Sequence, residues 1–239
     1  MISNKTHTIQ EEILCQAREF GATNAGITRV EDLKESPSYE KYQRDPYYEF
    51  FDGLPAYPEG AKSILIFSLR HKKSEPQLDW WDPKPGGTPG NRILIQIQKK
   101  MESWLEEVLD IQAKSLPYKI ENGGIFLKDS AALAGIGILG KNNLLLTPEY
   151  GSSVRLRAMF LDAALEPSGP LDFDPCTECH KPCFEACPQK AFRNGFYQRE
   201  YCQVQMRIDE ANVKPLADDP NTDHVKYCRA CELACPLAR

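Results

Sequence analysis

The sequence predicts an α+β fold followed by a cysteine-rich module at the C-terminal end. Two segments carry apolar residues at helical spacing, one nearly continuous apolar run is typical of a buried strand, and eight of the nine cysteines lie in the last 64 residues. A chain of 239 residues is long enough for one hydrophobic core and a smaller module. The composition changes at Glu166–Pro175, so we expect a core domain at residues 1–168 and a module at residues 169–239.

Three helices are expected in the core domain. Residues 8–20 have an apolar face, and Gly21 is placed to end that helix. A long helix is expected to begin at Asn91 as its cap, and its apolar face comprises Ile93, Leu94, Ile97, Met101, Trp104, Leu105 and Val108. Residues 126–134 are expected to form a third, shorter helix.

Strands are predicted at residues 24–28, 62–69, 116–121, 142–147 and 153–162. The last two are expected to be joined by a turn around Pro148–Gly151. In residues 153–162, one face is expected to carry Val154, Leu156, Ala158 and Phe160, and the other Arg155, Arg157 and Met159. Residues 31–60 are interpreted as loop and short helix, and the proline- and glycine-rich residues 82–91 as irregular.

Charge and hydropathy narrow the class of partners. The net charge of −5 gives no long-range attraction to nucleic acid or to an anionic membrane. No apolar run approaches the roughly 20 residues of a membrane-spanning helix. The N-terminus has no apolar signal region, so we expect a cytoplasmic protein without a membrane partner.

The stretch GIGILGKN at Gly135–Asn142 resembles a phosphate-binding loop but lacks its final hydroxyl residue. Helix-like residues precede these glycines and strand-like residues follow them, which is the reverse of a nucleotide loop. We therefore do not expect a nucleotide here. The simplest alternative is that the glycines allow a tight turn from a helix to a strand.

The cysteine block predicts two iron–sulfur clusters. Eight thiolates are the number that two four-iron clusters require, and each cysteine run ends in Cys-Pro, as in ferredoxins. In two-cluster ferredoxins the cysteine before proline binds the other cluster. This crossing rule assigns the first cluster to Cys176, Cys179, Cys183 and Cys235, and the second to Cys187, Cys202, Cys228 and Cys231.

Two structural zinc sites are the alternative interpretation, because paired C-x2-C motifs also bind zinc. Zinc does not favour the terminal Cys-Pro or so tight a run of four cysteines. Cys15 is interpreted as a small core residue on an apolar helix face, and His180 as a surface residue rather than a ligand.

The sequence AGIGILGKN at 134–142, the two strands after it and the double cysteine run together resemble the epoxyqueuosine reductases. The segments AREFGATNAGIT and KSILIFSL are also similar, so the resemblance covers most of the chain. It implies a nitroreductase-like α/β core that holds cobalamin, beside a ferredoxin-like module with two 4Fe-4S clusters. It also implies an oxidoreductase, with cobalt that has no protein ligand below it.

The resemblance further implies site residues in the core domain. The loop residues Gly135, Gly137, Gly140, Lys141 and Asn142 are expected near the corrinoid. Glu121 matches the position of the family's proton donor, where the family has aspartate, and a solvated carboxylate is the alternative reading of Glu121. Asp129 is the rival acid in a different register.

Three functions remain open from the sequence. The first is a reductase that passes single electrons through two clusters to a corrinoid and a small substrate. The second is a reductive activator of a corrinoid protein, and the third is a two-cluster electron carrier without cobalamin, whose core binds no cofactor or a flavin. A reduced protein of the ferredoxin or flavodoxin type is the expected electron donor. The family's C-terminal helical repeats are not in this sequence, so we do not expect tRNA, or nucleic acid in general, as a partner.

Overall fold

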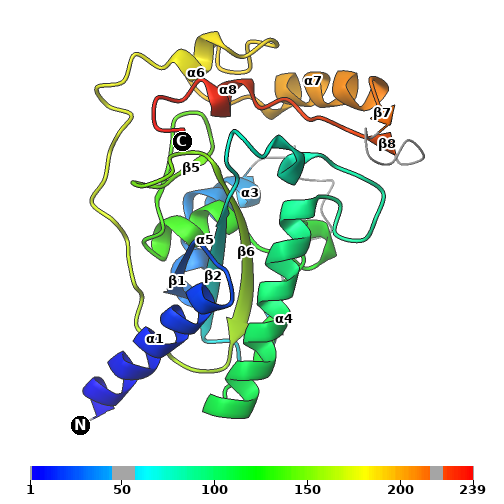
Figure 1. Cartoon of the computed structure of the whole chain (residues 1–239). Coiled ribbons are helices and arrows are strands. Elements are labelled where there is room, and N and C mark those ends of the chain that lie inside the picture. The colour runs from blue at the N-terminus through cyan, green and yellow to red at the C-terminus, as the bar shows by residue number, and fades with distance from the viewer. Residues whose placement is uncertain (1, 45–56, 216–222, 239) are drawn as a thin grey trace. The chain divides into compact units, whose positions relative to one another are not determined.

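The computed structural model describes residues 2–44, 57–215 and 223–238 (Figure 1). It contains both helices and sheet, as predicted, and divides into two compact units built from interleaved stretches of chain. The first unit comprises Met1–Leu69, Leu94–Ile138 and Leu156–Asp172. The second comprises Arg70–Ile93, Leu139–Arg155 and Phe173–Arg239, and therefore includes the whole cysteine block.

The first unit is built on a four-stranded sheet with the order β1-β2-β6-β3. Its strands are β1 (Asn24–Arg29), β2 (Ser63–Arg70), β3 (Ala113–Ser115) and β6 (Val154–Leu161). β1 runs antiparallel to β2, with Ile27 opposite Leu65, and β3 runs antiparallel to β6, with Lys114 opposite Phe160. The central strands β2 and β6 are largely buried, as their apolar sequences predict.

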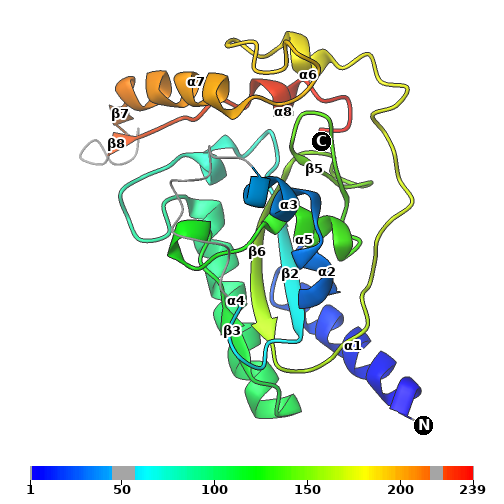
Figure 2. The same ribbon diagram turned by 180° about the vertical axis from the view of Figure 1, so that it is seen from behind.

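Helices cover both faces of this sheet. On one face, α1 (Ile2–Glu19) and α4 (Pro89–Leu109) form a core with the strands, in which Ile13, Phe67 and Ile97 are buried. On the other face lie α2 (Val30–Lys34), α3 (Pro37–Arg44) and α5 (Leu127–Leu133), in front of β2 in Figure 2. Burial of both sheet faces explains why β2 is apolar along nearly its whole length.

Most of the core elements match their predictions. α5, β1, β2 and β6 lie within two residues of their predicted bounds, while α1 begins earlier than predicted, at Ile2, and ends at Glu19, shortly before Gly21 with its φ of +109°. The predicted alternation along β6 is confirmed on its central residues. Met159 belongs to the core beneath α4, and the Phe160 ring lies 5.6 Å from the Tyr57 ring on the opposite face.

Two local predictions are wrong. Asn91 does not cap α4, because its backbone N–H donates to Thr88 Oγ1 at 3.1 Å and its side chain bonds Gly86 instead. Thr88 is therefore the cap, with Pro89 in the first helical position that proline favours. The strand predicted at 116–121 lies earlier, at β3, and the 3-10 helix η3 (Ile120–Asn122) occupies its end. Within the predicted loop at 31–60, residues 45–56 lie outside the described residues.

The second unit has short elements joined by long connections. They are η2 (Pro76–Asp79), β5 (Leu145–Leu146), α6 (Pro182–Glu185), α7 (Arg199–Ala211), β7 (Lys214–Pro215), β8 (Asp223–His224) and α8 (Ala230–Leu233). The strand predicted at 142–147 shortens to β5, which pairs with β4 (Ile138–Leu139) rather than with β6. Within the described part of the chain, none of the helices combines the length and apolar character needed to span a membrane.

Candidate metal centre

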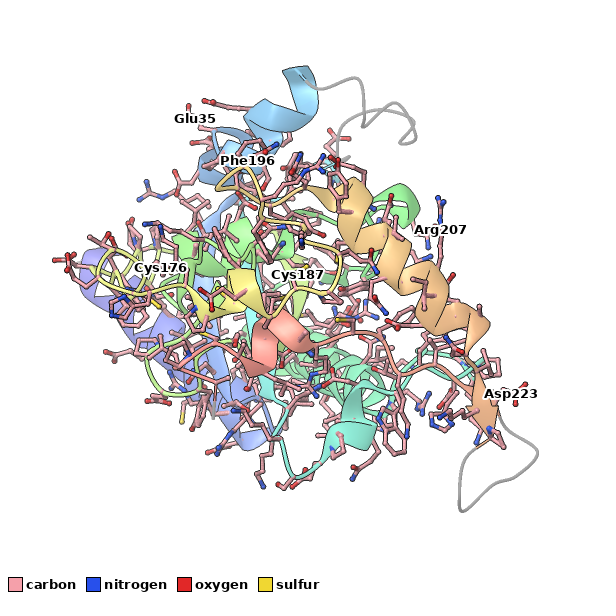
Figure 3. The ribbon with its side chains drawn as sticks, turned by 90° about the horizontal axis from the view of Figure 1, so that it is seen from above. Glu35, Cys176, Cys187, Phe196, Arg207 and Asp223 are labelled. Atoms are coloured by element: carbon pink, nitrogen blue, oxygen red, sulfur yellow. The ribbon has the colours of Figure 1, made fainter. Side chains whose placement is uncertain are left out.

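The eight clustered cysteines all belong to the second unit. Cys183 lies on α6, Cys202 on α7 and Cys231 on α8, and the others lie in the turns beside these helices. Figure 3 marks Cys176 and Cys187, one on each side of α6 in the sequence. All eight are free thiols, which leaves them available as ligands.

Cys183 and the three thiols whose charges act on its pKa are called the first group. Burial and then the charges of Cys235, Cys179 and Cys176 together raise the pKa of Cys183 to about 11. Cys235 belongs to the second cysteine run, so the first group draws on both runs. The crossing rule proposes these four thiols for the first cluster, and that ligand assignment stays a prediction.

Cys231 and the three thiols whose charges act most on its pKa are called the second group. Burial and then the charges of Cys202, Cys228 and Cys187 together raise the pKa of Cys231 to about 12. Burial also raises the pKa of Cys228, and Cys202 and Cys187 again contribute. Cys183 of the first group adds to the shift at Cys231, so the two groups are close enough to interact.

Backbone N–H groups point at three of the sulfurs. Lys181 N–H lies 3.4 Å from Cys179 Sγ, Ala191 N–H 3.3 Å from Cys187 Sγ, and Ala230 N–H 3.5 Å from Cys228 Sγ. Hydrogen bonds to ligand sulfurs are one of the features that set the reduction potential of iron–sulfur clusters. Lys181 has a φ of 56°, a left-handed conformation that is uncommon outside glycine and that turns the chain after Cys179.

Among the described residues, no group of three or more His, Cys, Asp or Glu side chains is arranged to hold one metal ion. Four sulfurs around one zinc ion, each about 2.3 Å from the metal, would form such a compact group. A four-iron cluster holds its ligands farther apart, because iron and sulfide ions fill the space between them.

Sequence reasoning did not identify the side chains around the thiols. Tyr197 is partly buried, and this desolvation, followed by its hydrogen bond and proximity to Cys202, raises its pKa above the ordinary value. Asp79 and Glu232, which also lie in this unit, pair both with Arg155 and with Arg229, the residue after Cys228. The only signal for Arg229 and Glu232 in the sequence was their position beside Cys228 and Cys231.

The glycine loop makes contacts with the protein's own backbone. Gly135 has a φ of +70°, and an added Cβ would lie 2.9 Å from both Gly169 Cα and Ser168 O. Gly137 is buried. Glycine at position 135 is therefore required by the close approach of residues 168–169, which supports the interpretation as a tight turn.

The second half of this loop belongs to the other unit and forms a turn. Asn142 is buried, and its Oδ1 accepts a hydrogen bond from Leu144 N at 3.2 Å. A Cβ at Gly140 would lie 2.6 Å from the Leu146 side chain. Lys141 Nζ lies 3.5 Å from the carbonyl oxygen of Cys176, so this side chain reaches the first cysteine run.

Of the two candidate proton donors, the structure describes the side chain of Asp129 but not that of Glu121. The backbone of Glu121 lies in η3, but its side chain lies outside the described residues. Asp129 is buried in α5, where Ser38 donates to it from its backbone N–H at 3.1 Å and from its Oγ at 2.6 Å. Both carboxylate oxygens of Asp129 therefore accept hydrogen bonds from Ser38 in the first turn of α3, so the role of Asp129 is structural.

Two residues outside the ligand set were also assigned from the sequence. Cys15 is exposed, so its interpretation as a core residue is wrong. The buried stripe of α1 passes through Ile13 and Ala17 and leaves Cys15 on the solvent side. His180 is exposed, as predicted for a surface residue.

Sequence comparison places the chain among known proteins, although no family model matches it. The chain is 33% identical to the epoxyqueuosine reductase of Bacillus subtilis over 97% of its own length and 64% of the relative's. It is 30% identical to the epoxyqueuosine reductase of Lactococcus garvieae over 96% of its length, which covers 69% of that relative. The chain belongs to the epoxyqueuosine reductase family.

Solved structures with the same fold include an epoxyqueuosine reductase crystallised with an epoxyqueuosine-modified tRNA stem loop. It matches 97% of this chain and 66% of its own, with a TM-score of 0.68 and 22% identity. A reductive dehalogenase whose structure suggests a mechanism for B12-dependent dehalogenation matches 75% of this chain and 25% of its own, with a TM-score of 0.54 and 16% identity. At these identities the solved structures support the fold.

Proposed function

We propose that this chain is an iron–sulfur reductase that passes single electrons through two 4Fe-4S clusters to a cobalamin and on to its substrate. The observation that carries this proposal is the gathering of eight free thiols in the second unit, where the pKa of Cys183 and that of Cys231 are each raised by the charges of other thiols of the set. The first cluster would be held by Cys176, Cys179, Cys183 and Cys235, and the second by Cys187, Cys202, Cys228 and Cys231. This division supports a ferredoxin-like module better than two zinc sites.

The exposure of the ligands suggests the direction of electron flow. Cys228 of the second group is exposed, whereas Cys183 and Cys235 of the first group are buried. We propose that a reduced ferredoxin- or flavodoxin-type protein delivers electrons at the second group. The first group would then be the inner cluster, from which electrons leave toward the corrinoid.

The proposal of cobalamin rests on the relatives rather than on a visible cradle. The contacts described for Gly135, Lys141 and Asn142 are to the protein's own groups. A bound corrinoid would supply a strongly reducing cobalt centre, while the protein positions it and excludes side reactions. We propose a nitroreductase-like first unit as its binding domain and Glu121 as the group that holds the proton for the substrate.

The family suggests a substrate to test first. A solved relative contains an epoxyqueuosine-modified tRNA stem loop, which runs against the expectation that nucleic acid is not a partner. We therefore propose the modified stem loop as the first substrate, with a small molecule or a corrinoid protein as the alternatives. The net charge of −5 predicts that any phosphate contacts depend on local basic residues.

The test is anaerobic turnover with reduced flavodoxin, cobalamin and the modified stem loop, followed by mass analysis of the released nucleoside. Loss of the epoxide oxygen, dependent on both cobalamin and the reduced protein, is the expected result. An unmodified stem loop is the control. If the bound corrinoid is reduced stoichiometrically but the modified stem loop is not converted, the stem loop is not the substrate and the alternatives are tested next. A protein that takes up no iron would overturn it.

A further inference from the structure

A closed ring of four charged side chains, each less than a third exposed, lies beside the second cysteine run, entirely within the second unit. Its members are Asp79 at the end of η2, Arg155 on β6, and Arg229 and Glu232 around α8. The exposed fractions of these side chains are 11% for Asp79, 29% for Arg155, 13% for Arg229 and 5% for Glu232. Charges with so little water around them interact more strongly than surface pairs.

Each arginine in the ring bridges the same two carboxylates. Arg155 Nε lies 2.7 Å from Asp79 Oδ1, and its Nη2 lies 2.8 Å from Glu232 Oε2. Arg229 Nη1 lies 2.6 Å from Asp79 Oδ2, and its Nη2 contacts Glu232 Oε1. Positive and negative groups therefore alternate around the ring, and no charge in it is left uncompensated.

Asp79 is the member that ties the ring to the rest of the unit. Burial alone raises its pKa, but the hydrogen bond with His71 and the charges of Arg155 and Arg229 outweigh this and hold the pKa below its ordinary value. The His71 ring is fully buried, and its Nδ1 lies 2.7 Å from Asp79 Oδ1. Asp79 is therefore a carboxylate fixed by three partners.

The ring also alternates with the proposed cluster ligands along the chain. Arg229 directly follows Cys228, and Glu232 directly follows Cys231. The second cysteine run is also bonded to Ser152, whose Oγ donates to the carbonyl oxygen of Glu232 at 3.1 Å. A Cβ at Gly151 would lie 2.0 Å from the carbonyl oxygen of Leu237, so the backbones approach closely there as well.

We infer that Asp79 is a positioning residue that holds Arg229 and Glu232 in place, and thereby sets the reduction potential of the cluster bound by Cys228 and Cys231. The inference rests on the proposed two-cluster function. Local net charge is one of the properties that determine the potential of an iron–sulfur cluster. Because reduction adds an electron, a more positive surrounding raises the potential and a more negative one lowers it.

Two substitutions change the ring in opposite directions. Asp79→Asn keeps the side-chain shape but leaves two arginines with one carboxylate, so the potential of the second cluster is expected to rise. Arg155→Gln leaves two carboxylates with one arginine, so the same potential is expected to fall. A tenfold change in the one-electron equilibrium, which is about 59 mV, is the scale expected for each.

Asp82→Asn is the matched control. Asp82 is also a buried carboxylate of the second unit, but its partners are Arg92, at 3.0 Å and 2.8 Å, and the backbone N–H of Lys84 at 2.9 Å. It lies three residues from Asp79 and also pairs with arginine, but both of its oxygens bond the single residue Arg92, whereas the oxygens of Asp79 contact two different arginines. Its substitution is expected to destabilise the fold without moving the cluster potential.

The experiment is an anaerobic redox titration of the full reconstituted chain, followed by electron paramagnetic resonance, with iron content measured for each sample. Cys228→Ser identifies the redox step of the second cluster, because that step disappears in it. Opposite shifts of this step in Asp79→Asn and Arg155→Gln, with no shift in Asp82→Asn, are expected.

The outcomes separate this inference from the proposed function. Two redox steps in the unmodified chain, combined with shifts of the same sign in both variants or with no shift, would overturn the inference alone. Fewer than two steps in the unmodified chain would overturn the two-cluster function and the inference with it. If Asp79→Asn retains no second cluster while Asp82→Asn retains it, the positioning role is supported, and Arg155→Gln still tests the sign of the potential.

Discussion

The crossed assignment of the cysteines predicts which iron is lost when one thiol is replaced. Cys235 lies in the second run, four residues after Cys231, yet it groups with Cys183 of the first run. Cys235→Ser and Cys183→Ser should therefore damage the same cluster, whereas Cys231→Ser should damage the other. An uncrossed arrangement, with one cluster per run, would pair Cys235 with Cys231 instead.

The size of the effect follows from four ligands per cluster. Each single substitution should lower the iron content from about eight to about four per chain, because a cluster missing one thiolate ligand is the one that is lost. Cys15→Ser is the control, since Cys15 is an exposed thiol on α1 outside the block. It should leave the iron content unchanged.

The assay is iron and sulfide analysis after anaerobic reconstitution, with electron paramagnetic resonance to identify the remaining cluster. Cys235→Ser and Cys183→Ser should leave the same signal, and Cys231→Ser the complementary one. The reasoning would be refuted if Cys235→Ser and Cys231→Ser left the same signal, or if any of the three variants kept its full iron content.

Three further predictions concern the loop, the thiols and the acids. Gly135→Ala should destabilise the chain by about 2–4 kcal/mol in urea unfolding, because it adds a Cβ against Ser168 and Gly169 at a left-handed position. Gly60→Ala, with a φ of +81° but nothing within 4 Å, should cost only about 1 kcal/mol; equal losses would contradict the role of the contact. The metal-free protein should lose stability as the pH rises above 9, since the folded-state pKa values of Cys183 and Cys231, about 11 and about 12, lie above the ordinary thiol value of 9.0. Urea unfolding at pH 7.5 and pH 10 checks this, and Cys231→Ala should reduce the difference; an unchanged difference would count against the burial of that thiol. Glu121→Gln should lower turnover by about 100-fold or more without reducing bound corrinoid, and full activity would place the acid elsewhere. Asp129→Asn should instead lower stability by about 1–3 kcal/mol through its Ser38 bonds.

The sequence predicted the elements whose signals are local. The helix α1 and the strand β6 follow from apolar periodicity, and the strand β2 follows from its nearly continuous apolar run. The crossed assignment of the thiols, which depends only on spacing and on the cysteine before proline, stays a prediction. The failures at Asn91 and at residues 116–121 arose where a neighbouring group competed. Thr88 provided the cap, and the carbonyl oxygen of Lys119 accepted bonds from Asn122 and Gly124 and turned the chain.

The charge ring could not be predicted in the same way. Arg155 and Glu232 are separated by 77 residues, and their pairing depends on how β6 and α8 come together in the fold. Asp79, in a proline-flanked segment, had no motif to distinguish it from Asp82. The exposure of Cys15 was similarly decided by packing, because a shift of one position on an amphipathic helix moves a side chain from the core to solvent.

The measurement that tests the central claim most directly is a cobalamin titration of the reconstituted protein without oxygen, recorded by visible spectroscopy together with iron content. The account predicts about eight irons per chain and saturation at one corrinoid per chain, with the bound corrinoid reduced when electrons are supplied through the clusters. Eight irons with no corrinoid binding would contradict the reductase and leave a two-cluster electron carrier.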